Sequence, residues 1–148
     1  MLVFSGIVGS RSSRKGTVKG PVGEAEILAL NPQRRDLILR VTRWNDVYPG
    51  TLNLEVEPDI VERLLSCSPL IQEQGANVRY PEPYAHIPRL RAGYLYYQAV
   101  IRIGDRSASV LIRRAVNPLR GRVEALADRS LREFLSLTDG DRVTCEVA

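Results

Sequence analysis

Short stretches in which apolar and polar residues alternate dominate the chain. This alternation places successive side chains on opposite faces and is typical of half-buried β-strands. One such stretch, residues 36–42, alternates through Leu37, Leu39 and Val41. We predict strands over residues 4–8, 24–30, 36–42, 51–56, 94–103, 106–113, 122–127 and 142–147. This number of short strands with few helices predicts an all-β barrel or sandwich.

Turn signals separate several of these stretches. Gly104-Asp105 lies between the strands predicted at 94–103 and 106–113, and this residue pair favours a tight hairpin turn. Pro49-Gly50 comes directly before the strand at 51–56. Proline suits the second position of a type II turn and glycine the third, so we predict that turn here.

Two segments have helical spacing instead. Residues 58–65 begin with a proline and carry apolar side chains at helical intervals, namely Ile60, Val61, Leu64 and Leu65. Residues 129–135 follow Asp128, a good N-cap, and place Leu131, Phe134 and Leu135 on one face. We therefore predict two short helices.

A long stretch with little periodicity lies between the two helices. Residues 67–93 contain prolines at 69, 81, 83 and 88, and connections of this length are usually functional or disordered. Tyr80, Tyr84 and His86 lie within it. Two interpretations remain open: these rings line a pocket for a flat aromatic ligand, or they attach the loop to the barrel.

Size and composition exclude several classes of protein. A chain of 148 residues is long enough for one domain with a hydrophobic core, and it has no continuous apolar run that would span a bilayer. The first residues lack the basic region of a signal peptide, so we expect a cytoplasmic protein. With two cysteines and one histidine, the usual zinc ligands are too few.

The positive charge is unevenly distributed. The net charge is only +4, which argues against a dedicated nucleic-acid-binding protein. However, both lysines, Lys15 and Lys19, lie with Arg11 and Arg14 in residues 10–20, a segment without acidic residues. This basic segment suits an anionic ligand, although a solvated loop has the same composition.

The strand after Pro49-Gly50 carries the candidate chemistry. Leu52, Leu54 and Val56 should share one face, while Thr51 and Asn53 point to the other. A hydroxyl and a carboxamide so placed are hard oxygen donors that suit Mg²⁺ and a phosphate group. The alternative is that both are ordinary residues of a solvent-exposed strand face.

Four motifs now carry a family resemblance. Pro49-Gly50-Thr51-Leu52-Asn53-Leu54 is similar to the strand motif of the archaeal CTP-dependent riboflavin kinases. Residues 131–141, Leu-Arg-Glu-Phe-Leu-Ser-Leu-Thr-Asp-Gly-Asp, look like the C-terminal segment of that family. Glu124-Ala125-Leu126-Ala127 and Ile103-Gly104-Asp105 also match in type and spacing. The resemblance extends from about residue 48 to the C-terminus.

The resemblance implies a fold and an activity. The fold is mainly β: a small six-stranded cradle-loop (RIFT-like) barrel with two short helices and a long proline-rich loop, in a single domain over residues 1–148. The implied activity is transfer of the γ-phosphate of CTP to riboflavin, which gives FMN and CDP. Its cofactors are Mg²⁺ and CTP as phosphate donor, its partners are small molecules, and it involves no membrane.

The resemblance also implies roles for individual residues. Thr51 and Asn53 would bind the magnesium ion. Glu124 would face the flavin together with Asn117, and Glu124 is also the candidate catalytic residue. The nucleotide would be bound by residues of the predicted second helix and of the basic segment, namely Arg129, Ser130, Leu131, Arg132, Ser10, Arg11, Arg14, Lys15 and Gly16.

The chain departs from the family pattern at two places. The family opens with a glycine-rich loop, whereas Gly9 is followed here by the cation-rich residues 10–15. Arginine and lysine side chains can hold phosphates as forks and point charges. The threonine that the family has eight residues before its glutamate is Val116 here, with Asn117 beside it as a substitute.

Two other functions fit the same residues. One is a non-catalytic barrel that keeps the nucleotide or flavin pocket for binding or regulation, which the altered loop suggests. The other is a nucleic-acid-binding barrel that uses residues 11–19 and further arginines. Those arginines, which also suit a solvated surface, are Arg34, Arg35, Arg113, Arg114, Arg120 and Arg122.

Overall fold

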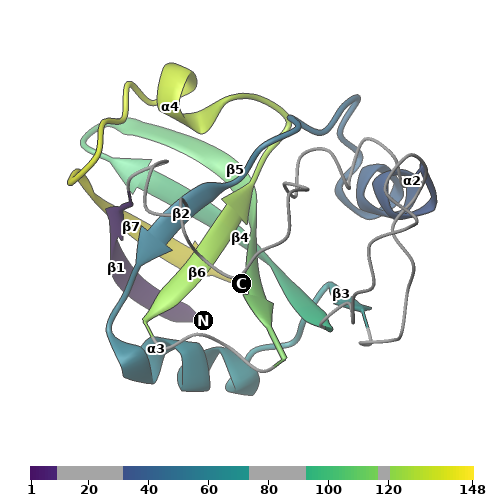
Figure 1. Cartoon of the computed structure of the whole chain (residues 1–148), viewed down its shortest axis with the longest axis horizontal. Coiled ribbons are helices and arrows are strands. Elements are labelled where there is room, and N and C mark those ends of the chain that lie inside the picture. Colours follow the sequence, from purple (N-terminus) through teal and green to yellow (C-terminus); the bar gives the residue numbers. More distant parts are fainter. Residues whose placement is uncertain (10–31, 74–92, 117–120) are drawn as a thin grey trace, which may run out of the picture.

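The computed structural model of the chain describes residues 1–9, 32–73, 93–116 and 121–148 (Figure 1). The strand predicted at 24–30 lies outside these residues, as do Tyr80, Tyr84 and His86. Within the described ranges, no helix is both long and apolar enough to cross a membrane.

The fold is mainly β, as predicted. Six antiparallel strands close into a barrel in the order β4-β5-β6-β2-β1-β7, and β7 pairs back onto β4 (Figure 1). A short seventh strand, β3, pairs with the first half of β4 beside β7. The strands are β1 Leu2–Val8, β2 Leu52–Glu55, β3 Ile71–Glu73, β4 Tyr94–Ile103, β5 Arg106–Ala115, β6 Arg122–Leu126 and β7 Arg142–Val147.

The apolar members of each alternating strand fill the inside of the barrel. Leu52 and Leu54 of β2, Ile112 of β5 and Cys145 of β7 all belong to one buried cluster, here called the barrel core. Because successive strand residues point to opposite faces, the residues between them lie on the outside. The alternation therefore predicted these strands correctly, and β4 and β7 have the predicted bounds.

The two predicted turns have different outcomes. Ile103 and Arg106 are paired, so the β4–β5 hairpin has a two-residue loop as predicted. Gly104 has φ +59°, the conformation that a type II′ hairpin turn requires of its first residue. The type II turn predicted at Pro49-Gly50 is wrong, because Gly50 does not have positive φ. Instead the Gly50 amide donates to the Tyr48 carbonyl at 2.8 Å, which is a γ-turn centred on Pro49.

The strand predicted at 36–42 is also wrong, since these residues belong to helix α2, Pro32–Thr42. Proline is favoured in the first turn of a helix. Arg34 and Ile38, four residues apart, are both buried while Asp36 between them is exposed, which fits the helical period and not the strand period. Helix α2 packs outside the barrel, where Ile38 contacts a second apolar cluster that includes Tyr96, Leu111 and Leu126.

The other helices correspond to the two predicted ones. Helix α3, Pro58–Arg63, continues as the 3₁₀ turn η2, Leu64–Ser66, and its apolar residues join the barrel core. Helix α4, Leu131–Phe134, is shorter than predicted. Its N-cap is Ser130, whose hydroxyl accepts a bond from the Glu133 amide, and not Asp128. Strand β3 was not predicted, because it is only three residues long and lies in the proline-rich stretch.

Candidate functional site

A row of polar side chains crosses four neighbouring strands on the outside of the barrel. Asn53 of β2 is directly opposite Glu124 of β6, Glu124 is opposite Arg113 of β5, and Arg113 is opposite Tyr96 of β4. Directly opposed residues of antiparallel strands share a face and bring their side chains together. We call these four residues the polar ladder.

The centre of the polar ladder is a buried ion pair. Arg113 is 2% exposed and Glu124 is 8% exposed, and the Arg113 guanidinium binds Oε2 of Glu124. An adjacent guanidinium favours the ionised form of a carboxylate. The Arg113 guanidinium also lies over the Tyr94 ring, 4.3 Å from its centroid. Glu124 is therefore a charged acceptor whose position is set by its neighbour.

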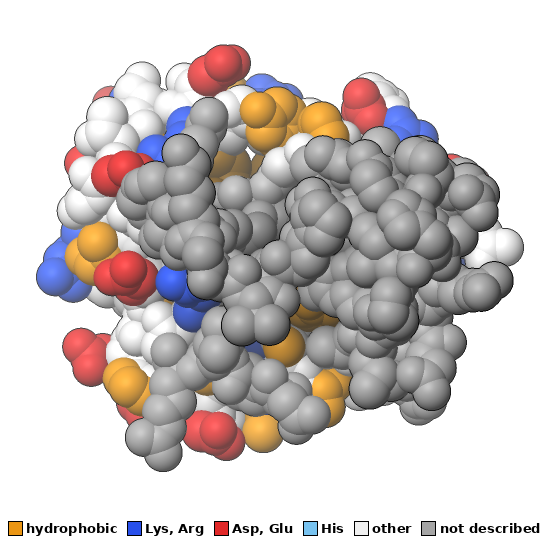
Figure 2. All heavy atoms as spheres, in the orientation of Figure 1, with side chains coloured by type: hydrophobic (Ala, Val, Ile, Leu, Met, Phe, Trp, Pro, Cys, Tyr) orange, Lys and Arg blue, Asp and Glu red, His pale blue; other side chains and the backbone are white. Residues whose placement is uncertain are grey.

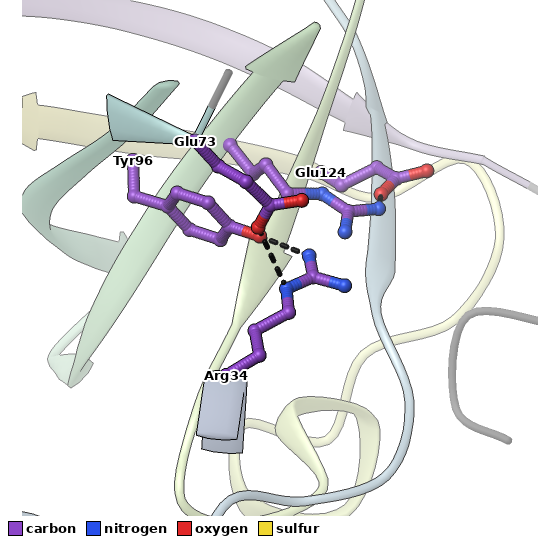
Figure 3. Close-up of polar contacts among 5 residues, drawn as sticks. Arg34, Glu73, Tyr96 and Glu124 are labelled. Carbon is purple, nitrogen blue, oxygen red and sulfur yellow. Dashed lines mark hydrogen bonds and ion pairs between the residues drawn. The ribbon is translucent and has the colours of Figure 1, made fainter. Parts of the chain in front are cut away.

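Helix α2 reaches the far end of the polar ladder. The Arg34 guanidinium donates to the Tyr96 hydroxyl, and its Nε is 3.1 Å from a carboxylate oxygen of Glu73 on β3 (Figure 3). Burial raises the pKa of the Tyr96 hydroxyl, and the positive charges of Arg113 and Arg34 oppose this rise. Tyr96 is thus a neutral hydroxyl held between two cations.

At the other end, the polar ladder meets Gly9, the last described residue before the basic segment. Asn53 is 8% exposed, and Thr51, just before β2, is half-buried. The Gly9 amide donates to the Asn53 carbonyl at 2.8 Å. A Cβ at Gly9 would lie 3.4 Å from the Cβ of Asn53, an ordinary van der Waals contact. Gly9, the last described residue before the basic segment, therefore lies directly against Asn53.

Arg132 connects helix α4 to Gly9. Its guanidinium donates to the Gly9 carbonyl at 2.7 Å and lies 2.8 Å from the Asp139 carboxylate. Residues 9, 53 and 132 come from three distant parts of the sequence, and the fold brings them together. Among the predicted nucleotide-binding residues that the structure describes, Arg132 is the one bonded to Gly9, which directly follows β1.

The rest of the predicted nucleotide-binding group has other contacts. Leu131 packs in the barrel core, so only its backbone is available to a ligand. Arg129 is exposed and pairs with Asp128 at 3.0 Å, a contact that raises the pKa of Arg129. Its guanidinium also lies 4.4 Å from the centroid of the Phe134 ring. These neighbours hold Arg129 at the protein surface.

Several predicted site residues lie outside the described parts of the chain. They are Ser10, Arg11, Arg14, Lys15 and Gly16 of the basic segment, and Asn117 on the flavin side. The roles assigned to them remain predictions.

The donor set near β2 suits magnesium better than zinc. In the described ranges, His, Cys, Asp and Glu nowhere form a group of three that could hold a metal ion. Magnesium that arrives with nucleotide phosphates needs about one or two protein ligands and keeps several waters. The oxygen donors Thr51 and Asn53 fit such an ion.

Three of the arginines considered for nucleic-acid binding are buried. Arg34, Arg113 and Arg114 are all buried, and each has partners within the chain. Arg35 pairs with Asp46 at 2.5 Å. Figure 2 shows basic and acidic side chains interspersed on the described part of this face, with no broad basic patch. The interpretation as surface residues was therefore wrong for Arg34, Arg113 and Arg114, whereas Arg35 and Arg122 are partly exposed and Arg120 lies outside the described residues.

Sequence reasoning missed Arg113, Tyr96 and Arg34 as members of the site. A signal was present for Arg113, because it follows the apolar run Val110-Leu111-Ile112 inside a predicted strand. A cation at that position requires a buried partner. The sequence could not identify the partner as Glu124, since that depends on the pairing of β5 with β6.

The chain is similar to known proteins over more than half of its length. Residues 44–147 match the family model named CTP-dep_RFKase, described as the domain of unknown function DUF120. A riboflavin kinase of Methanothermobacter thermautotrophicus is 32% identical over 103 residues, covering 69% of this chain and 72% of that protein. One of Saccharolobus solfataricus is 29% identical over 133 residues, covering 90% of this chain and 72% of that protein. One of Aeropyrum pernix is 38% identical over 97 residues, covering 65% of this chain and 67% of that protein.

Proposed function

The chain belongs to the CTP-dependent riboflavin kinase family, a family of phosphotransferases, and from this premise we propose its reaction. The protein transfers the γ-phosphate of CTP to the 5′-hydroxyl of riboflavin, and the products are FMN and CDP. The substrates are small molecules, and the nucleotide carries Mg²⁺. Membership of the family supports the riboflavin substrate, and the family name supports CTP as donor.

The observation that carries the proposal is the register of β2 against β6. Asn53, the proposed metal ligand, is directly opposite Glu124, the proposed flavin contact. The Cβ atoms of such a pair lie about 4.5–5.5 Å apart. A phosphate bound at Asn53 and a flavin alcohol at Glu124 would therefore be neighbours, as direct transfer between them requires.

Thr51 and Asn53 are the residues that would hold the magnesium ion. When bound, the ion neutralises the charge that develops on the nucleotide phosphates. The hydroxyl of Thr51 and the amide oxygen of Asn53 supply neutral ligands. They leave the carboxylate of Glu124 to the other substrate.

Glu124 accepts a hydrogen bond from riboflavin in this proposal, and Asn117 contacts the flavin beside it. Glu124 is also the candidate acceptor of the 5′-hydroxyl proton. The ion pair with Arg113 holds this carboxylate in place, and phosphoryl transfer depends more on positioning and charge neutralisation than on proton abstraction.

The nucleotide is bound by two groups of residues. Arg129 and Arg132, with the backbone of Ser130 and Leu131, contact the cytidine nucleotide. Residues of the basic segment, namely Ser10, Arg11, Arg14, Lys15 and Gly16, hold its phosphates in place of a glycine-rich loop. Support for this arrangement comes from Gly9, which leads into the basic segment and bonds both Asn53 and Arg132.

The test is an assay of the purified protein with riboflavin, Mg²⁺ and each of CTP, ATP, GTP and UTP. We expect FMN and the nucleoside diphosphate in equal amounts, with CTP as the preferred donor. Turnover with ATP alone would overturn the choice of donor. Affinity for flavin or CTP without any product would instead support the non-catalytic barrel.

A further inference from the structure

We propose that Arg113 is a positioning residue for riboflavin recognition, which acts by fixing the Glu124 carboxylate. The inference rests on the proposed function, because it assigns the flavin contact to Glu124. Arg113 itself need not touch either substrate.

The first reason is the energetic character of the ion pair. Both partners are buried, and the removal of two charges from water costs more than their attraction commonly returns. Replacement of a buried ion pair by apolar residues of similar volume is often neutral or stabilising. A buried ion pair on the face that carries Asn53 is therefore better explained by the orientation of Glu124 than by stability.

The second reason is that Arg113 is itself held in place. The Tyr94 ring lies against its guanidinium at 4.3 Å, and such cation–π contacts restrict the plane of an arginine. Tyr96, directly opposite on β4, is fixed by the bond from Arg34 (Figure 3). A guanidinium confined in this way defines where the carboxylate oxygen can lie.

The neighbouring Arg114 is a buried arginine with a structural role, and its contacts differ from those of Arg113. It is equally buried, but it points to the opposite side of β5 and donates only to backbone carbonyls in the described contacts. These carbonyls belong to Val61 at 2.7 Å, Ala115 at 2.9 Å and Val116 at 3.0 Å. Arg114 thus attaches helix α3 to the barrel, whereas Arg113 binds the one carboxylate of the polar ladder.

A double-mutant cycle separates positioning from stability. The variants are Arg113→Met, Glu124→Gln and the double variant, assayed for the KM of riboflavin and of CTP. If Arg113 acts through Glu124, Arg113→Met raises the riboflavin KM about tenfold in the parent protein and less than about twofold in the Glu124→Gln background. The KM of CTP should change less than about twofold in each case.

Two further variants control for folding. Arg114→Met removes a buried arginine of the same size, and it should lower the melting temperature while showing no coupling to Glu124→Gln. Arg113→Lys keeps the buried charge without the planar fork, and it should fold and raise the riboflavin KM about threefold. This variant keeps the inference testable if Arg113→Met does not fold.

The outcomes distinguish the inference from the proposed function. Equal effects of Arg113→Met on riboflavin KM in both backgrounds, or an unchanged riboflavin KM in Arg113→Lys, would overturn the positioning role while FMN synthesis by the parent protein stands. A parent protein that neither makes FMN nor quenches riboflavin fluorescence would overturn both.

Discussion

Inside the barrel the strands meet through apolar side chains, whereas on the outside four of the same strands meet through charged and hydroxyl groups. Leu54 on β2 is fully buried in the barrel core, and Asn53 beside it faces Glu124 in the polar ladder. The backbone is shared, so the two faces cannot be built independently. The comparison teaches that the apolar face sets the register in which the polar face is assembled.

The pKa shifts of titratable groups on the two faces also have different causes. Burial raises the pKa of the Cys145 thiol in the barrel core to about 12, and no neighbouring charge contributes to that shift. Burial also raises the pKa of Tyr96, but there two arginines oppose it. No charge contributes to the shift of Cys145 in the barrel core, whereas two arginines compensate in part for the burial of Tyr96 on the outer face.

Truncation of the interior should produce the largest effect on stability. Leu54→Ala removes a side chain with no exposure, and such changes cost about 2–5 kcal/mol through lost burial and a residual cavity. Chemical denaturation should show this loss, while the riboflavin KM of the folded fraction stays unchanged. A large change of KM with little loss of stability would remove the distinction between the two faces.

The adjacent residue should show the reverse. Asn53→Ala is expected to lower kcat/KM for FMN formation about 100-fold, or about 2.7 kcal/mol, because a metal ligand is lost. Its denaturation midpoint should remain near that of the parent. Asn53→Asp, which keeps an oxygen at this position, is the matched control and should retain more activity than the alanine variant.

The raised pKa of the Cys145 thiol predicts that the protein loses stability at alkaline pH. The folded pKa of Cys145, about 12, lies above the ordinary value of 9.0, so the unfolded chain releases its proton first as the pH rises. The contribution of the buried thiol to the free energy of unfolding is complete below pH 9. Above that pH it declines by roughly 1.4 kcal/mol per pH unit. Denaturation at pH 8 to 11 measures the slope.

Cys145→Ala is the control for that slope. It should be less stable at neutral pH, because it leaves a small cavity, yet lose less stability between pH 9 and 11. An identical slope in both proteins would show that the thiol does not ionise on unfolding in this range.

The smallest effect is expected at a surface contact that belongs to neither face. Phe134→Leu removes the ring that lies against the Arg129 guanidinium, a contact worth about 0.5–1 kcal/mol at exposed sites. The KM of CTP should therefore rise about two- to fivefold, and that of riboflavin should not change. Phe134→Tyr keeps the ring and should behave like the parent in the same steady-state assay.

Much of the fold could be predicted because strand alternation is a local signal. The predictions at 94–103 and 142–147 agree with β4 and β7 to the residue. The prediction at 36–42 failed because Leu37, Leu39 and Val41 alternate, yet Leu37 and Val41 also lie at helical spacing. The packing of Ile38 against Tyr96 and Leu111 favours the helix, and residues 36–42 alone do not reveal that contact.

The candidate site was predictable in part. Thr51, Asn53 and Glu124 were chosen by motif, and the pairing of β2 with β6 brings Asn53 and Glu124 face to face. Arg34 was instead assigned to the surface, because an arginine in an isolated sequence is usually exposed. Its burial depends on Glu73 and Tyr96, which are far away in the chain.

By itself, the sequence of this protein determined which stretches alternate and where the turn of the β4–β5 hairpin lies. It also determined which oxygen-bearing residues lie in or directly before strands β2 and β6. The tertiary structure decided which of these residues meet, and it made Arg113 and Tyr96 part of the polar ladder. The physical reason is range: alternation and turn preference act between neighbours in the chain. Strand register and burial of charge are settled only when the barrel closes and distant strands pair.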